Sequence, residues 1–296
     1  MVDVAEDPFV PLPSRPGFDL EEFTRRFAGY HKLLSMLYLR ALGLSGLEGF
    51  IVTRWSAEVE REVQDYCRRH GWGELLLRHD RRPEVPSAPR GGYLFKVSRF
   101  KEEMENYSKQ QRILILFEPR SPYDDRYSMN FMFAPGEDTG VIEVVGPGFD
   151  ASDLQRGDIT PHEQVTIRLD NLARGFTSPS RVVIQRDVVD PTGYRKTVEQ
   201  RLLKIARRHG LNDSPAAAQE FLQKRGKTLL TSHLDCYEPI PEELLKRYFS
   251  TICDVPQDLF GVSGRSGRCV ISMSVLHPDD AFVFWDIVWP QLKYTF

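Results

Sequence analysis

The chain has 296 residues, of which 41% are hydrophobic, so it can bury a large core as one domain or as two lobes. Its 39 basic residues nearly balance 42 acidic ones, giving a net charge of -3. This balance disfavours sequence-independent nucleic-acid binding, although a local basic face stays open. The first 16 residues lack the charged and apolar segments of a signal peptide, and no 18-residue apolar run predicts a membrane span. The four cysteines form no CxxC pair, which fits a reducing compartment, so we expect a cytoplasmic protein.

The elements predicted by periodicity begin after a proline-rich arm, residues 1–16, that we expect to be flexible. Apolar residues at helical spacing predict a helix over 20–42, and Ser56 is a plausible N-cap for an amphipathic helix over 57–70. Further helices are predicted over the ranges 101–110, 197–209, 215 onward and 241–252. Strands are predicted at 49–53, 74–78, 92–97, 112–117, 127–133, 141–145, 164–169, near Gly261 and at 268–275. Strands with irregularly interspersed helices indicate an α+β fold.

The C-terminal stretch 282–296 is aromatic and contains Asp286. It is typical of a buried strand or helix that closes the core, since the basic flank of a membrane-surface anchor is missing. The Gly146-Pro147-Gly148 sequence after a strand is typical of a turn with special backbone angles and not of a dinucleotide site. His162 and His233 show no metal-site spacing and read as ordinary surface or core residues.

Five separated segments resemble, in order, the ATP-binding domain of the phosphoenolpyruvate synthase, pyruvate phosphate dikinase and rifampin phosphotransferase group. They lie over residues 28–275, a span that takes in most of the chain. The segments are His31-Lys32-Leu33 continuing through 42–44 to 49–53; 77–80 with Glu84 and 91–93; 114–119; 141–148 with 156–162; and 256–259.

The resemblance implies an α+β, ATP-grasp-like fold with two lobes, residues 17–118 and 119–296, and a nucleotide cleft between them. It implies ATP and Mg²⁺ as ligands. Lys32 would be a point charge on the phosphates and Arg78 a bidentate clamp. Their convergence opposite the 112–119 strand is the geometric core of this prediction.

The remaining residues implied by the resemblance are three carboxylates, Glu84, Glu118 and Glu143, and a glycine pair. The Gly91-Gly92 turn would let the backbone approach a phosphate. Glu118 would lie at the hinge and Glu143 near the nucleotide, while Glu84 matches a glutamate of the second segment. The plainer alternatives are a solvated Lys32, a salt bridge from Arg78 to Asp80 or Glu84, a hairpin at the glycines, and ordinary strand-end carboxylates.

The catalytic end of the family pattern departs here. The family's metal-binding Glu aligns with Phe260, and its Gln and Arg fall near Met273 and Val275. Losing metal ligands matters for phosphoryl transfer. Possible substitutes are Asp254 and Asp258 for a metal and Arg265 or Arg268 for phosphates, although these residues also suit a polar hairpin turn.

Three functions therefore stay open. The first is ATP/Mg-dependent phosphoryl transfer to a small-molecule acceptor or a partner protein, with no nucleic acid or membrane partner. The second is a catalytically degenerate nucleotide-binding or scaffolding protein of the same fold. A third, less favoured, is an interaction module that uses the aromatic C-terminal segment.

Overall fold

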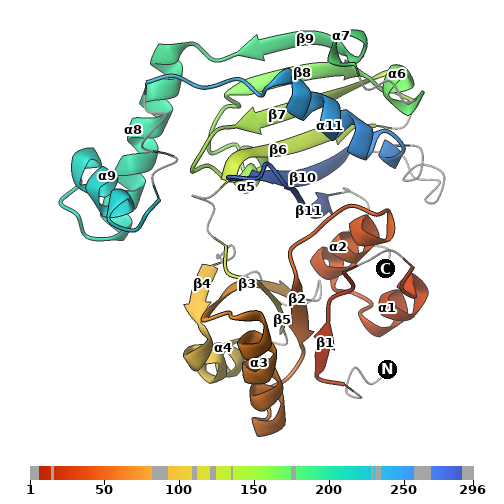
Figure 1. The fold of residues 1–296 in the computed structure, drawn as a ribbon, viewed down its shortest axis with the longest axis vertical. Helices are drawn as coiled ribbons and strands as arrows, with labels where there is room; N and C mark the ends of the chain where they lie inside the picture. The colour runs from red at the N-terminus through yellow and green to blue at the C-terminus, as the bar shows by residue number, and fades with distance from the viewer. Residues whose placement is uncertain are drawn as a thin grey trace. The chain divides into compact units, whose positions relative to one another are not determined.

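The computed structural model describes residues 7–14, 17–81, 93–108, 112–120, 125–134, 136–174, 178–227, 230, 235–256 and 268–288. The chain forms two compact units: unit 1, Met1–Ser121 with Val283–Phe296, and unit 2, Pro122–Phe282. Each is built from antiparallel strands and helices (Figure 1), so the predicted α+β class is confirmed. The stretch 283–296, which the sequence prediction placed in the second lobe, belongs to unit 1.

Unit 1 is a five-stranded antiparallel sheet with helices on both faces. Its strand order is β1 (Phe9–Pro11), β2 (Gly49–Val52), β5 (Arg112–Phe117), β3 (Glu74–Arg81) and β4 (Tyr93–Lys96). Its helices are α1 (Leu20–Arg26), α2 (His31–Ala41), α3 (Ala57–His70) and α4 (Phe100–Ser108). Alternate strand residues such as Leu75, Leu77 and Leu116 pack with α3 and α4 in one apolar cluster.

The helix α3 forms where the sequence predicts it, residue for residue. The Ser56 hydroxyl accepts a hydrogen bond from the Val59 N–H, and Gly71 ends the helix in a left-handed conformation. The predicted single helix over 20–42 is wrong, because it breaks into α1 and α2. The break contains Gly29, whose φ of 89° lies outside the helical region.

The expectation of a flexible arm is wrong for residues 9–11. They form β1, which pairs with Phe50–Val52. Phe9 stacks on Phe50, with ring centroids 4.9 Å apart, and Val10 is buried. Pro11 is tolerated there because β1 is an edge strand. Strand pairing and the contact between the Phe9 and Phe50 rings thus order a segment whose proline-rich composition predicted flexibility.

Unit 2 contains an antiparallel sheet in the order β10 (Cys269–Leu276), β6 (Asp125–Phe133), β7 (Thr139–Val145), β8 (Glu163–Arg168) and β9 (Val183–Val188). Its helices include α5 (Ala151–Gln155), α6 (Leu169–Ala173), α7 (Pro179–Val182), α8 (Pro191–Arg208), α9 (Pro215–Gln223) and α11 (Glu242–Ile252). Strand β11 (Phe282–Val288) then enters unit 1. The strand expected near Gly261 lies outside the described residues.

The two faces of the unit 2 sheet differ in chemistry. Phe131 on one face packs edge-on against Tyr248 of α11, with ring centroids 6.5 Å apart, and α11 crosses that face in Figure 1. On the other face Asn130 and Ser272 contact α5 through hydrogen bonds to Ala151 and from Gln155. One face is therefore the apolar core face, and the other carries polar side chains.

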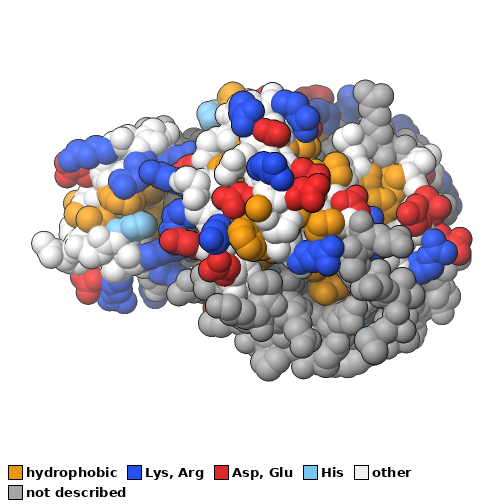
Figure 2. Space-filling view, turned by 90° about the horizontal axis from the view of Figure 1, so that it is seen from below, with side chains coloured by type: hydrophobic (Ala, Val, Ile, Leu, Met, Phe, Trp, Pro, Cys, Tyr) orange, Lys and Arg blue, Asp and Glu red, His pale blue; other side chains and the backbone are white. Residues whose placement is uncertain are grey.

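Charge is unevenly distributed over unit 2. Figure 2 shows Lys and Arg side chains gathered at the left, where α8 and α9 lie. Within 191–227 the basic residues are Arg195, Lys196, Arg201, Lys204, Arg207, Arg208, Lys224, Arg225 and Lys227, against Glu199, Asp213 and Glu220. This is the kind of local basic face that a net charge of -3 leaves open.

In the described part of the chain no helix is both long enough and apolar enough to cross a bilayer.

Candidate functional site

The polar face of the unit 2 sheet carries a continuous row of side chains that can bind a polar ligand. Cross-strand pairing places five residues, one from each strand, directly opposite one another: Ser272, Asn130, Glu143, Gln164 and Asp187. We call this set the polar row. Directly opposed residues in an antiparallel sheet have Cβ atoms about 5 Å apart, so neighbours in the row can share a ligand.

One end of the polar row is buried and fixed. Asn130 donates from Nδ2 to the Ala151 carbonyl at 3.0 Å, and its Oδ1 accepts from the Ser272 hydroxyl at 2.8 Å. The Gln155 amide donates to the same hydroxyl at 2.5 Å. Because their hydrogen-bonding groups are engaged, Asn130 and Ser272 hold α5 against the sheet.

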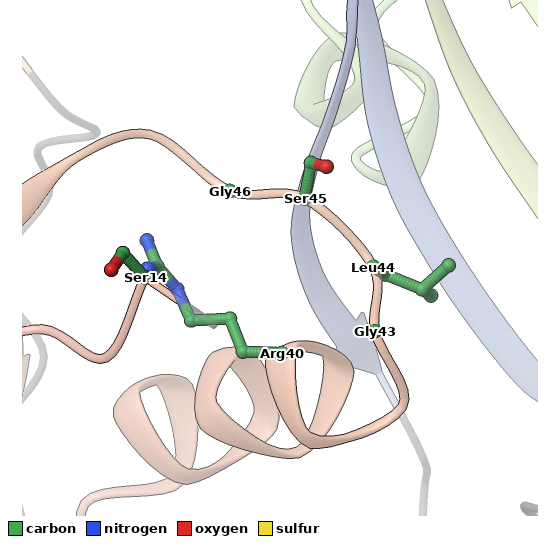
Figure 3. A pocket seen from close by; sticks show the side chains of 6 residues that line it. All are labelled: Ser14, Arg40, Gly43, Leu44, Ser45 and Gly46. Atoms are coloured by element: carbon green, nitrogen blue, oxygen red, sulfur yellow. The ribbon is translucent and has the colours of Figure 1, made fainter. Parts of the chain in front are cut away.

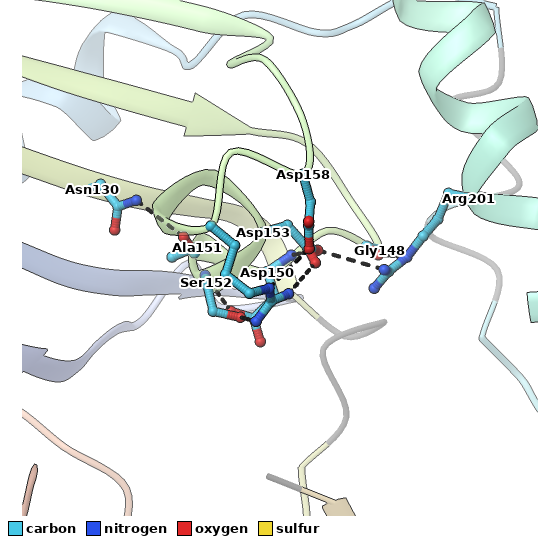
Figure 4. Close-up of polar contacts among 9 residues, drawn as sticks. Asn130, Gly148, Asp150, Ala151, Ser152, Asp153, Asp158 and Arg201 are labelled. Carbon is cyan, nitrogen blue, oxygen red and sulfur yellow. Dashed lines mark hydrogen bonds and ion pairs between the residues drawn. The ribbon is translucent and has the colours of Figure 1, made fainter. Parts of the chain in front are cut away.

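The short helix α5 is itself held by charge. The Asp150 and Asp153 side chains form a reciprocal capping box at its start. Arg201 of α8 donates to the Gly148 carbonyl at 2.9 Å and lies 3.5 Å from the Asp153 carboxylate (Figure 4). Gly148 has a φ of 80°, so the turn predicted from Gly146-Pro147-Gly148 is confirmed.

Glu143 lies at the centre of the polar row and is half-buried. Burial raises the pKa of the Glu143 carboxyl, while Arg268 and a hydrogen bond from Gln164 act in the opposite direction. Of the residues implied by the sequence resemblance, Glu143 is thus the one in a polar, partly desolvated sheet environment. Arg268, a candidate for contacting phosphates, acts electrostatically on this same carboxylate.

The register also places two residues named in the sequence resemblance. Met273 and Val275, near which the resemblance would put a Gln and an Arg, are both fully buried on the apolar face of β10. Their neighbours Ser272 and Ser274 point to the opposite face, because side chains alternate along a strand. Among the described residues, no group of three or more His, Cys, Asp or Glu could hold a metal ion.

Arg78 on β3 is engaged within unit 1. Its guanidinium forms an ion pair with Asp286 of β11 and donates to the Trp285 carbonyl at 3.1 Å. Both charged side chains are largely buried, at 22% and 12% exposure. The ion-pair partner of Arg78 is therefore Asp286. The alternative of a salt bridge from Arg78 to Asp80 is wrong. The Asp80 carboxylate accepts a hydrogen bond from the Leu33 N–H at 2.9 Å.

Lys32 is the second residue of α2, next to Leu33. The hydrogen bond from Leu33 to Asp80 brings the start of α2 to the sheet face that also carries Arg78. The convergence of Lys32 and Arg78 on phosphates stays a prediction. Glu118 follows β5, and its carboxylate accepts from the Glu48 N–H at 3.2 Å, which closes the end of the β2–β5 pair.

Several predicted positions lie outside the described residues: Glu84, Gly91, Gly92, Asp258, Phe260, Arg265 and His233.

A buried cluster behind the Gly146 turn was not predicted from the sequence. His162 accepts from the Gly146 N–H at 3.0 Å and is ringed by Phe149, Tyr194 and Tyr237. Its Nε2 and the Tyr194 hydroxyl have no hydrogen-bond partner among the described atoms. Burial lowers the pKa of His162 to about 4.

A second buried group anchors the segment before α11. Glu163 is fully buried and forms an ion pair with Arg186 of β9. Its other carboxylate oxygen accepts from the Tyr237 hydroxyl at 2.7 Å and from the Ile240 N–H at 3.0 Å. These contacts connect β8 to β9 and to the segment before α11, and the cluster therefore stabilises this part of unit 2.

Comparison with known proteins gives structural similarity alone. No family model matches the chain, and no curated protein matches it in sequence. D-alanyl-alanine synthetase A from Vibrio cholerae is similar with a TM-score of 0.40 and 9% identity, over 88% of this chain and 56% of that one. The D-alanine-D-alanine ligase from Coxiella burnetii gives 0.39 and 10%, over 90% and 52%. D-cycloserine synthetase DcsG gives 0.37 and 12%, over 90% and 63%.

These structures are ATP-grasp enzymes and not members of the dikinase group. The chain spans little more than half the length of the first two. Scores below 0.5 do not establish a common fold, so the nucleotide-binding assignment is a proposal.

We expect the Arg78–Asp286 ion pair to stabilise unit 1. Arg78→Met should lower the free energy of unfolding by about 2–3 kcal/mol, because it leaves a largely buried carboxylate without its cation. Urea unfolding of Arg78→Met, of Asp286→Asn and of the double variant measures the coupling energy between the two side chains. Arg68→Met, which breaks an exposed pair with Asp65, should change stability by less than about 0.5 kcal/mol. Additive effects of the Arg78 and Asp286 variants would contradict this interpretation.

His162 should make unit 2 sensitive to acid. Above pH 6.5 the imidazole is neutral in both states and its contribution is complete; between pH 6.5 and about 4 only the unfolded state takes up a proton. The free energy of unfolding should therefore fall by up to about 1.4 kcal/mol per pH unit from this residue. Urea unfolding at pH 7.5, 6 and 5 should show a shallower slope for His162→Asn and an unchanged one for exposed His277→Asn. Equal slopes in all three proteins would contradict the prediction.

Proposed function

We propose that this chain binds ATP in an ATP-grasp-like manner and that Glu143 contributes to the site. The observation that carries the proposal is the position of Glu143 at the centre of the polar row, between Asn130 and Gln164. This is also the glutamate that the sequence resemblance assigns to the nucleotide. A half-buried carboxylate beside neutral amides suits a ligand that brings a metal ion or hydrogen-bond donors with it.

At the centre of the polar row, Glu143 offers a carboxylate that could bind a magnesium ion together with the phosphates of a nucleotide. Mg²⁺ in nucleotide sites is commonly held by one or two carboxylates together with the substrate phosphates. Glu143 is the carboxylate that would take this part, since the Asn130 Oδ1 already accepts a hydrogen bond from Ser272. The ion would supply charge neutralisation on the phosphates. Arg268, which acts on Glu143, would add positive charge beside the same group.

In its catalytic form the proposal is phosphoryl transfer to a small-molecule acceptor or a partner protein, without nucleic-acid or membrane partners. The roles of Lys32 and Arg78 at phosphates stay predictions from the sequence resemblance.

The second candidate is a degenerate nucleotide-binding or scaffolding protein. Two observations favour it. Met273 and Val275, near which the sequence resemblance would put a Gln and an Arg, are buried in the apolar core, and Arg78 is paired with Asp286. The response of ATP affinity to Mg²⁺ discriminates the two candidates.

Calorimetric titration with ATP, with and without Mg²⁺, tests the proposal. We expect Mg²⁺ to tighten ATP binding in the unaltered protein. Glu143→Gln should weaken Mg-ATP binding at least tenfold, about 1.4 kcal/mol, because it removes the carboxylate while keeping the side-chain shape. Glu199→Gln, on the exposed face of α8, is the matched control and should bind as the unaltered protein does.

Failure of the unaltered protein to bind ATP would overturn the proposal. ATP binding that ignores both Mg²⁺ and Glu143→Gln would favour the degenerate alternative. Turnover of ATP in the presence of an acceptor distinguishes the catalytic form from simple binding.

A further inference from the structure

A buried arginine in unit 1 lies outside the proposed nucleotide chemistry. Arg40, in the last turn of α2, is 5% exposed. Its guanidinium donates to the carbonyl oxygens of Pro13 and Leu47, which ties the segment after β1 to the segment before β2. The remaining donor, Nε, has no hydrogen-bond partner among the described atoms.

Among the described residues, no carboxylate pairs directly with Arg40. Both hydrogen-bond acceptors are uncharged carbonyls, and no ion pair within 4.0 Å joins Arg40 to a carboxylate of the described residues. Burial lowers the pKa of Arg40 to about 10, and Glu118 acts electrostatically in the opposite direction. Arginine is rarely buried without a counter-charge, since removing a cation from water costs several kcal/mol.

A cavity adjoins this arginine. It has a volume of about 130 Å³ and is lined by Arg40, Ser14 and the loop residues Gly43, Leu44, Ser45 and Gly46 (Figure 3). One water occupies roughly 30 Å³ in the liquid, so the cavity has room for a small polyatomic ion. A Cβ on Gly46 would lie 2.9 Å from the Arg40 Nη2, so the guanidinium occupies space that a larger residue would fill.

We propose that this cavity, the Arg40 cavity, is a binding site for a phosphate-sized oxyanion, either free phosphate or the phosphate group of a small phosphomonoester. Arg40 lines this cavity together with Ser14 and Ser45, and its Nε is a charged donor without a hydrogen-bond partner among the described atoms. A guanidinium matches the planar spacing of phosphate oxygens, and charge-assisted hydrogen bonds of this kind are strong. The anion supplies the counter-charge that the described residues leave out.

An internal carboxylate provides the sharpest test. Ser45→Asp places a negative charge on an exposed residue lining the cavity, where it replaces the anion. Thermal unfolding is followed while phosphate, or glycerol phosphate, replaces chloride at constant ionic strength. The unaltered protein should show a saturable rise in unfolding temperature with at least one of the two anions. Ser45→Asp should lose that response and be more stable than the unaltered protein in chloride.

The matched control is Ser98→Asp, an exposed serine of unit 1 remote in sequence from the loop, which should keep the full response. Arg40→Met should weaken phosphate binding at least tenfold; should it fail to fold, Ser45→Asp still decides. Equal effects of chloride and both anions on the unaltered protein would overturn the proposal. So would a Ser45→Asp response equal to that of Ser98→Asp. Because the probe is phosphate and not ATP, the result is independent of whether the polar row binds a nucleotide.

Discussion

The proposed nucleotide site depends on the alternation of side chains between the two faces of the unit 2 sheet. An antiparallel strand sends successive side chains to opposite faces, and in β6, β7 and β10 this alternation separates an apolar core from a polar surface. Register then aligns Asn130, Glu143 and Gln164 across three strands. A slip of one residue would bury Glu143 against α11 and expose core residues, so burial of the opposite face fixes the row.

Ion pairs between partly exposed arginines and buried carboxylates stabilise each unit internally. Arg78 pairs with Asp286 and Arg186 with Glu163, and Arg201 lies beside Asp153. In each case the carboxylate is the more deeply buried partner, and truncating its arginine would leave that charge uncompensated in the low dielectric of the interior. Arg40 is itself buried, and its hydrogen-bond acceptors are carbonyls. Because its acceptors are uncharged, an anion in the adjoining cavity would supply the missing counter-charge.

Local signals in the sequence predicted the local structure well. The Ser56 cap and apolar spacing gave α3, and the Arg112–Phe117 run gave β5. Signals that depend on distant partners were missed. The strand β1 needs the edge of β2 and the ring of Phe50. The strand β9 has no apolar–polar alternation in its sequence, and most of its side chains are exposed.

The candidate site divides in the same way. Glu143 was predicted from its sequence segment, but its neighbours in the row come from strands whose pairing no local pattern encodes. Asp286, the partner of Arg78, lies 208 residues further along the chain, so no local pattern could pair the two. The buried His162 cluster likewise combines residues from four separate segments.

Methionine methyl groups report on the two faces of the unit 2 sheet directly. Met132 lies half-buried on the polar face, opposite Val141 and two residues from Asn130, whereas Met129 and Met273 are buried on the apolar face. NMR spectra of protein labelled with ¹³C-methyl methionine, assigned with Met132→Leu, can be recorded during titration with Mg-ATP. Nucleotide binding at the polar row predicts that the Met132 signal shifts while those of Met129 and Met273 stay nearly fixed. Saturating Mg-ATP that leaves the Met132 signal unmoved would contradict it.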